Sequence, residues 1–470
     1  MPIRIALPKG RLLRKTAALL QKANWNLDEY HSRISFYHPK SERFPRLIIK
    51  VFHEKDIPIQ VAIGNYDLGI CGQDWMQELA VKYPSSSLVR VRELGYGYGS
   101  LYLAASPEQP MPLEKIRDRD SIIRIASEYP NLAESFALKN RFPRFCVFPV
   151  WGAADGYPPE NAELALLATE SAAALHPMGL RPISHVTDYN AVLIANRNSW
   201  AKKDLGEIIA SISGEIAGAE RAVNAEKVFG EIPVAPAPVK VPADTVRLAL
   251  PDGHQQQPTV ELLQKCGISM EDYPSDTGSR RPKISMARVT VKAIRPQDMP
   301  LQVANNNFDL AITGRDWLQE HLDQFPSSPV RRLIDLKFGK VKIVAVVSQK
   351  LPADDAAGLR RYHQERQTPL RIASEYVHIA DRYARENRLG YYMIVPTWGA
   401  TEAFLPEDAD LLIENTETGR TIARHSLRII DTLFESTAII IGSSRPVANK
   451  AKRGRIKSLL NTMRQAVEDA

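Results

Sequence analysis

Residues 410–422, DLLIENTETGRTI, combine the residue types that can bind a sugar phosphate. An apolar strand leads into a turn that is rich in hydroxyls and contains a glycine and a cation: Thr416, Thr418, Gly419, Arg420 and Thr421. Backbone N–H groups, hydroxyls and the start of a following helix can all donate hydrogen bonds to a phosphate. Glu414 lies just ahead of the turn, where a carboxylate can accept hydrogen bonds from the two hydroxyls of a ribose. The segment predicts a 5-phosphoribosyl-binding loop. A helix-capping turn with an exposed arginine is the alternative.

A second segment with chemical potential is PKGRL at residues 8–12, directly after the first predicted strand. Lys9 and Arg11 can hold a polyphosphate at the carboxyl end of that strand. Gly10 allows the backbone to approach such a ligand closely. The alternative is a strand-to-helix turn with two solvated basic side chains.

Composition and charge narrow the function classes. With 470 residues, 44% of them hydrophobic and 24% charged, the chain is typical of globular proteins. No apolar run reaches the roughly 18 residues of a membrane helix, and residues 1–12 hold no long secretory apolar segment. Cys71, Cys146 and Cys266 are too scattered for a disulfide framework or a zinc site. The net charge of +7 suits a small anionic substrate better than a nucleic acid. We therefore expect a cytoplasmic protein that contacts neither membrane nor nucleic acid.

Four motifs occur twice, in the same order and at a nearly constant separation. The pairs are RIALPKG at 4–10 with RLALPDG at 247–253, DLGICGQDW at 67–75 with DLAITGRDW at 309–317, RIASEY at 124–129 and 371–376, and WGA at 151–153 and 398–400. The chain is therefore a tandem duplication of a unit of about 225 residues, because such a period is too long for a solenoid. The proline-rich segment 231–243 predicts an extended, semi-rigid linker between the copies.

Predicted strands and helices alternate within each copy, which indicates an α/β fold with mostly parallel sheets covered by helices. A copy is long for one such sheet, so we expect two lobes with a ligand-binding crevice between them. We place copy one at 1–230, with lobe one at 1–95 and 184–230 and lobe two at 96–183. Copy two is placed at 244–470, with lobe one at 244–340 and 428–470 and lobe two at 341–427.

Together these motifs resemble the catalytic unit of the ATP phosphoribosyltransferase family, the first enzyme of histidine biosynthesis. The matching segments are Ala6 to Leu12, Asp56-Ile57-Pro58, Asp67 to Gly72, the pair Gly399 and Glu402, and the loop from Asp410 to Ile422. The resemblance implies a tandem repeat of a two-lobed fold similar to type II periplasmic binding proteins. It also implies Mg²⁺ as cofactor and ATP and phosphoribosyl pyrophosphate as substrates.

The resemblance also implies roles for single residues. Lys9, Arg11 and Arg295 are expected to be catalytic. The family has a basic residue three positions before the Asp of the Asp-Ile-Pro segment, and this position is Arg295 in copy two and His53 in copy one. The residues expected to bind substrate are Glu402, Asp410, Glu414, Thr416, Glu417, Thr418, Gly419, Arg420 and Thr421. The metal ligands are left unassigned.

The two copies depart from the family pattern in opposite places. Copy one keeps PKGRL, but its phosphate loop becomes Ser171-Ala172-Ala173-Ala174, and Leu167 replaces Glu414. Copy two keeps the loop, but Lys9-Gly10-Arg11 becomes Asp252-Gly253-His254. Because the two partial sets are complementary, we expect a fused dimer with one composite site per chain.

The sequence therefore predicts an ATP phosphoribosyltransferase that condenses its substrates to phosphoribosyl-ATP and pyrophosphate. Two alternatives remain: a catalytically impaired regulatory or nucleotide-binding paralogue, and a two-lobed solute-binding module. The missing secretory segment counts against the solute-binding module. An assembly of identical chains and a separate regulatory subunit are both compatible with the sequence.

Overall fold

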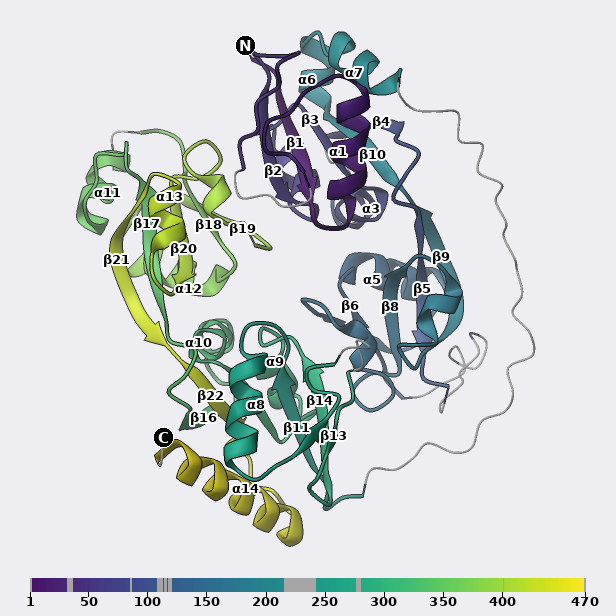
Figure 1. Cartoon of the computed structure of the whole chain (residues 1–470), viewed down its shortest axis with the longest axis vertical. Helices are drawn as coiled ribbons and strands as arrows, with labels where there is room; N and C mark the ends of the chain where they lie inside the picture. The colour runs from purple at the N-terminus through teal and green to yellow at the C-terminus, as the bar shows by residue number, and fades with distance from the viewer. Residues whose placement is uncertain are drawn as a thin grey trace. The chain divides into compact units, whose positions relative to one another are not determined.

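The computed structural model in Figure 1 describes residues 2–31, 37–84, 87–107, 113, 116, 121–214, 242–275, 280–364, 366–399 and 401–468. Most of the predicted linker 231–243 lies outside these residues. The chain forms two compact units. Unit 1 comprises Met1–Pro149, Ala162–Pro236 and Trp398–Ala403, and unit 2 comprises Val150–Asn161, Ala237–Thr397 and Phe404–Ala470. Each unit is therefore one copy of the repeat that has exchanged a short segment with the other copy.

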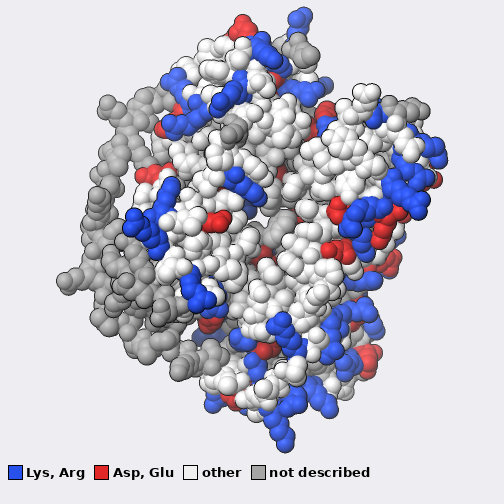
Figure 2. Space-filling model, turned by 180° about the vertical axis from the view of Figure 1, so that it is seen from behind, with Lys and Arg blue, Asp and Glu red and all other residues white. Residues whose placement is uncertain are grey.

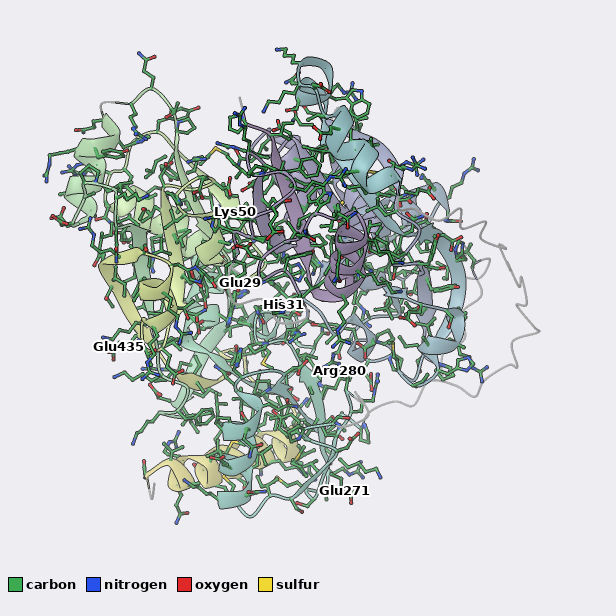
Figure 3. The ribbon with its side chains drawn as sticks, turned by 45° about the horizontal axis from the view of Figure 1, so that its top comes forward. Glu29, His31, Lys50, Glu271, Arg280 and Glu435 are labelled. Atoms are coloured by element: carbon green, nitrogen blue, oxygen red, sulfur yellow. The ribbon has the colours of Figure 1, made fainter. Side chains whose placement is uncertain are left out.

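The first lobe of unit 1 is built on a five-stranded sheet in the order β2-β1-β3-β10-β4. β1 runs parallel to β2 and β3, and β10 runs antiparallel to β3 and β4. The central strands are apolar along their length because helices cover both faces of the sheet. The elements are β1 (Arg4–Lys9), the 3-10 helix η1 (Gly10–Leu12), α1 (Leu13–Lys22), β2 (Ile48–His53), which carries Lys50 (Figure 3), α2 (Ile57–Ala62), β3 (Leu68–Gly72), α3 (Gln73–Lys82), β4 (Leu88–Glu93), β10 (Ala191–Asn196), α6 (Arg197–Lys202) and α7 (Gly206–Ser213).

The second lobe of unit 1 has a sheet in the order β7-β6-β8-β5-β9. Its elements are β5 (Gly99–Ala105), β6 (Ile123–Ser127), α5 (Pro130–Lys139), β7 (Phe145–Pro149), β8 (Leu164–Thr169), η3 (Ala172–Leu175) and β9 (Arg181–Tyr189). The chain leaves lobe one after β4, close to the predicted Gly95. It returns at Asn190, later than the predicted residue 184, because β9 pairs with β5 from Arg181 to Tyr189.

Unit 2 repeats both sheets, in the orders β14-β11-β15-β22-β16 and β19-β18-β20-β17-β21. Lobe one holds β11 (Val246–Pro251), α8 (Gln256–Lys265), β12 (Met270–Glu271), β13 (Lys283–Ile284), β14 (Val289–Ile294), α9 (Met299–Ala304), β15 (Leu310–Gly314), α10 (Arg315–Gln324), β16 (Val330–Asp335), β22 (Ala438–Ser443) and α14 (Lys450–Glu468). Lobe two holds β17 (Val341–Ser348), α11 (Ala356–Gln364), β18 (Leu370–Ser374), α12 (Val377–Glu386), β19 (Tyr392–Pro396), η4 (Thr401–Phe404, most of it grouped with unit 1), β20 (Leu411–Thr416), α13 (Arg420–Arg424) and β21 (Leu427–Ser436). The return crossing falls at Thr437 instead of the predicted 428, because β21 stays paired with β17 to Ser436.

Each of the four lobes has its own apolar core. The duplicated two-lobed α/β fold that the sequence predicts is thereby confirmed. On the face shown in Figure 2, acidic side chains lie among the basic ones. Within the described part of the chain, no helix combines the length and the hydropathy needed to cross a membrane.

The segment that copy one gives to unit 2 packs against the edge strand β14 and the start of α9. The buried Lys292 of β14 contacts Glu160 at 2.6 Å and Asn161 Oδ1 at 2.8 Å. The backbone N–H of Trp151 donates to both carboxylate oxygens of Asp298, at 3.1 and 3.2 Å. Burial lowers the pKa of Lys292 to about 8, and Glu160 partly counteracts this shift. A charged side chain of copy two therefore depends on a carboxylate of copy one.

Candidate functional site

The predicted phosphoribosyl loop forms a tight turn between β20 and α13. Gly419 has φ of +72°, a left-handed conformation that glycine adopts without strain. Its backbone N–H donates a hydrogen bond of 2.9 Å to Thr416 Oγ1, which fixes the shape of the turn. Four residues of this loop are exposed, where an anion can reach them: Glu417, Thr418, Arg420 and Thr421. The structure thus brings the predicted loop residues together.

The corresponding loop of copy one has another conformation. Ser171 is extended, with φ of −158° and ψ of 164°. Ala172, at the position of Gly419, begins the 3-10 helix η3 instead of a left-handed turn. Thr169, equivalent to Thr416, donates its hydroxyl to the carbonyl oxygen of Ser171 at 3.0 Å. The two loops therefore differ in backbone shape as well as in sequence.

Two predicted carboxylates lie at different places on β20. Glu414 is half-buried near the loop end and is paired with Val344 of β17. Asp410 precedes the strand and forms a bidentate ion pair with Arg371, with both contacts at 3.2 Å. A six-residue strand is about 20 Å long, so Asp410 is far from the loop and does not join it. Its role is to fix the start of the strand, as Glu163 does for Arg124 in copy one.

Glu402 is half-buried in η4 and belongs to unit 1, the unit that also holds Lys9 and Arg11. Lys9 ends β1 beside His53, its partner on β2, and its Nζ lies 5.6 Å from the ring centroid of Tyr37. The pKa of His53 is lowered to about 3 by burial and by the charges of Lys55, Lys9 and Arg11. His53 is therefore neutral, and its surroundings are electropositive.

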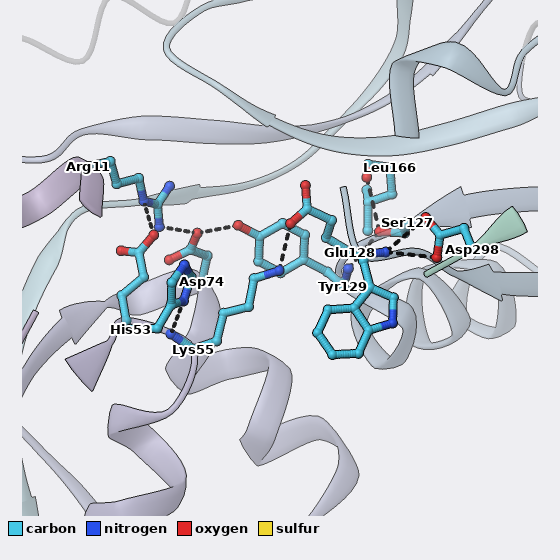
Figure 4. A network of polar contacts seen from close by, with 11 residues as sticks. Arg11, His53, Lys55, Asp74, Ser127, Glu128, Tyr129, Leu166 and Asp298 are labelled. Carbon is cyan, nitrogen blue, oxygen red and sulfur yellow. Dashed lines mark hydrogen bonds and ion pairs between the residues drawn. The ribbon is translucent and has the colours of Figure 1, made fainter. Parts of the chain in front are cut away.

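Arg11 occupies a network of charges that joins the two lobes of unit 1 (Figure 4). Its Nε lies 2.7 Å from Glu54, and its terminal nitrogen lies 2.5 Å from Asp74. Asp74 also accepts a hydrogen bond of 2.7 Å from the hydroxyl of Tyr129 in lobe two. The guanidinium packs 4.7 Å from the ring centroid of Tyr189 on β9. Burial opposes the charge of Arg11, but the two carboxylates outweigh it and raise its pKa.

These contacts add a structural role to the one predicted for Arg11. The sequence predicts that Arg11 holds a polyphosphate, with solvation as the alternative. The structure instead places its guanidinium against two protein carboxylates, with one third of the side chain exposed. Arg11 joins the lobes and positions the elements around Lys9.

Copy two keeps only part of this network. Asp316 accepts hydrogen bonds from the Tyr376 hydroxyl at 2.6 Å and from Ser436 Oγ at 2.8 Å. His254, at the position of Arg11, is exposed, and Pro296 replaces Glu54. The lobes of copy two therefore meet without the cation and without one of its carboxylates.

Several of these residues escaped the sequence prediction. Asp74 and Tyr129 stand in motifs that occur in both copies, Asp-Trp at 74–75 and Ser-Glu-Tyr at 127–129, so the repeat itself carried a signal for them. Glu54 has no counterpart in copy two, and no signal in the repeat marks it.

Arg295 lies at the end of β14 beside Asp252, with 3.6 Å between its terminal nitrogen and the carboxylate. A Cβ on Gly152 would lie 3.0 Å from its Nε, so the exchanged segment touches it closely. The two neighbours of Arg295 named here, Asp252 and Gly152, lie at the end of β11 and in the exchanged segment, and neither is part of the phosphoribosyl loop.

No group of three or more His, Cys, Asp or Glu side chains in the described ranges is arranged to hold a metal ion. Those residues therefore do not form a Mg²⁺ site made of protein ligands alone.

The fold and the loop define a duplicated, two-lobed α/β protein whose second copy carries a left-handed glycine turn between β20 and α13. The family model described as HisG, ATP phosphoribosyltransferase, matches residues 53–217 and 295–465, one match in each copy. The chain belongs to the ATP phosphoribosyltransferase family, and the two matches confirm the duplication.

Individual relatives match one copy at a time. The ATP phosphoribosyltransferase of Saccharolobus solfataricus is 31% identical over 231 residues, which cover 47% of this chain and 72% of the relative. That of Chlorobaculum parvum is 29% identical over 229 residues, which cover 48% of this chain and 72% of the relative.

Among solved structures, the ATP phosphoribosyl transferase (HisG:HisZ) complex from Thermotoga maritima is 21% identical, with a TM-score of 0.39 over 48% of this chain and 100% of that chain. The alkanesulfonate-binding protein SsuA from Xanthomonas axonopodis pv. citri, bound to MOPS, is 14% identical, with a TM-score of 0.29 over 45% of this chain and 72% of that chain.

Proposed function

We propose that the chain condenses ATP and phosphoribosyl pyrophosphate to phosphoribosyl-ATP and pyrophosphate, the first step of histidine biosynthesis, at one site per chain that uses residues of both copies. One observation carries the single site: the left-handed turn at Gly419 exists only in copy two, whereas Lys9 exists only in copy one. Membership of the family supports the reaction, and the complementary losses support its assignment to one site.

The loop of copy two is proposed to bind the phosphoribosyl group. The exposed Thr418 and Thr421 donate hydroxyls to the 5-phosphate, together with backbone N–H groups at the start of α13. Thr416 contributes indirectly, because its hydroxyl holds the Gly419 turn. Glu414 accepts hydrogen bonds from the ribose hydroxyls. Glu402 is proposed to bind the same substrate, as the family pattern implies.

The basic end of β1 is proposed to act on the leaving group. N1 of adenine attacks C1 of the ribose, the bond from C1 to the pyrophosphate oxygen breaks, and its electron pair leaves with pyrophosphate. Lys9 stabilises the growing negative charge, and the two lobes hold the reactants in line. Mg²⁺ is proposed to arrive bound to the substrate phosphates, which is common for this ion.

Three wider aspects stay predictions: a cytoplasmic location, an assembly of identical chains, and a separate regulatory subunit. The alternative of an impaired paralogue predicts the same loop asymmetry without turnover. An assay of phosphoribosyl-ATP formation by the purified chain separates these functions. Absence of product from the wild-type chain with both substrates and Mg²⁺ would overturn the proposal.

Substitutions test the composite site. Lys9→Ala and Glu414→Ala should each reduce turnover by about 10²–10³, the effect of removing a group aimed at transition-state charge. The matched controls at the equivalent positions of the other copy, Asp252→Ala and Leu167→Ala, should retain turnover close to wild type. If each copy instead held its own weak site, no single substitution would remove more than half of the activity.

Mixing the two inactive chains locates the site. A mixture of Lys9→Ala and Glu414→Ala chains should stay inactive if both residues act within one chain. Recovered activity would show that the site forms between chains, which would keep the reaction but contradict the single-chain site.

A further inference from the structure

Asp252, at the end of β11, is held by two arginines. Its Oδ2 lies 2.5 Å from Arg280 and 3.6 Å from Arg295. A second carboxylate, that of Asp155 in the exchanged segment, lies 3.7 Å from Nε of Arg280. The side chains of Asp252 and Arg280 are only 19% and 23% exposed, so water screens the pair weakly. Figure 3 labels Arg280.

Copy one has different residues at the same backbone positions. The carbonyl oxygen of Arg280 accepts from the N–H of Ala293 at 3.0 Å, as that of Tyr37 does from Val51 at 2.9 Å. Tyr37 is therefore the counterpart of Arg280, and Lys9 is the counterpart of Asp252.

The charges at this place are reversed between the copies. Copy one presents the cation Lys9 between an aromatic ring and the neutral His53. Copy two presents an anion, Asp252, between two cations. Copy one has a single cation here, Lys9, whereas copy two has Arg280 and Arg295, and the carboxylate of Asp252 contacts both.

A guanidinium pair that converges on one oxygen is a geometry that binds a carboxylate or a phosphate equally well. We infer that Asp252 is a built-in substitute for a ligand oxygen: Arg280 and Arg295 form a latent polyphosphate-binding site in copy two, and Asp252 occupies it permanently. Gly152 lies beside Arg295, because a Cβ at this position would come within 3.0 Å of its Nε. Asp252 and Arg280 lie outside the site of the proposed function, whereas the family resemblance also predicts a catalytic role for Arg295.

The inference predicts that removing the carboxylate opens the site. In the full-length Asp252→Asn chain, titration with inorganic pyrophosphate should show two binding events per chain, against one in the wild type. Adding Arg280→Gln should abolish the second event or weaken it by at least about tenfold, the scale of one charged hydrogen bond. Pyrophosphate should also raise the unfolding temperature of Asp252→Asn more than that of the wild type.

Asp354→Asn is the matched control, because it removes the same charge from a side chain that is 90% exposed in lobe two of the same unit. A second event in this control as well would show a general charge effect and overturn the inference. So would a folded Asp252→Asn chain with an unchanged number of events. If Asp252→Asn does not fold, Asp252→Ala carries the same expectation. A wild-type chain that binds no pyrophosphate would contradict the proposed function alone, since the event gained on substitution is counted separately.

Discussion

Replacing Arg11 with alanine should loosen the contact between the lobes of unit 1. The substitution removes the cation that lies 2.7 Å from Glu54 and 2.5 Å from Asp74. Asp74 has a fully buried side chain, and that of Glu54 is 9% exposed, so neither carboxylate can be rehydrated without moving. Two buried negative charges are left to repel each other.

The expected cost follows from this burial. Removing one partner of a buried ion pair destabilises a protein by about 3–5 kcal/mol. Because one third of the Arg11 side chain is exposed, solvent screens part of the effect, and we expect about 3 kcal/mol. The destabilisation caused by the substitution should become smaller as the pH is lowered. Burial already raises the pKa of Glu54 while Arg11 opposes the shift, so loss of Arg11 raises that pKa further. A raised carboxylate pKa costs stability above the unfolded value, and protonation therefore relieves the variant as the pH is lowered.

Hydrogen exchange of α3 and α5 measures the effect where it occurs, because a chain of four lobes does not unfold in one step. About 3 kcal/mol corresponds to exchange roughly 10²-fold faster in both helices. The equivalent helices α10 and α12 of unit 2 should be unchanged, and so should the exposed Arg14→Ala control. Exchange in α3 and α5 within about threefold of wild type would show that the Arg11 network does not hold the lobes together.

Two further outcomes are expected. Gly419→Ala forces a side chain into a left-handed turn at a cost of about 1 kcal/mol, so calorimetry should show phosphoribosyl pyrophosphate binding about fivefold more weakly. The control Ala172→Gly in copy one should leave this affinity unchanged. Equal effects of the two substitutions would contradict the loop asymmetry. His53 should titrate near pH 3 by NMR, and because the unfolded chain takes up that proton near pH 6.5, its contribution to stability should decline as the pH falls from 6.5 toward 3. A titration near pH 6 would show that His53 is neither buried nor surrounded by cations.

Most of the architecture could be predicted because four motifs occur in the same order in both copies, which reveals the duplication and its boundaries. The buried strands β1 and β3 are short apolar runs followed directly by a glycine or a helix, a pattern that is visible in the sequence alone. The return crossings were misplaced because β9 and β21 are partly exposed edge strands. Their sequences do not show that they stay paired with β5 and β17.

The site was harder to predict because its partners come from distant segments. The spacing of the loop motif includes Asp410, yet spacing does not reveal that a strand separates this carboxylate from the turn. Arg11 looked like a free cation because the two carboxylates that hold it follow other strands, 43 and 63 residues away in the chain. The charge reversal at Asp252 was visible, but its neutralisation by Arg280 depends on a segment outside any recognised motif.

The exchanged segments determine when each unit can be completed during synthesis of the chain. Val150–Asn161, which unit 2 requires, leaves the ribosome before any lobe of copy two has been made. Trp398–Ala403, which unit 1 requires, follows the rest of that unit only after a further stretch beyond Pro236, a delay of roughly 10–30 s at about 5–20 residues per second. Unit 1 therefore stays incomplete until its segment from copy two has been translated. The segment that copy one contributes to unit 2 is already present when translation of copy two begins. The copy translated first is therefore completed only after most of the second copy has been made.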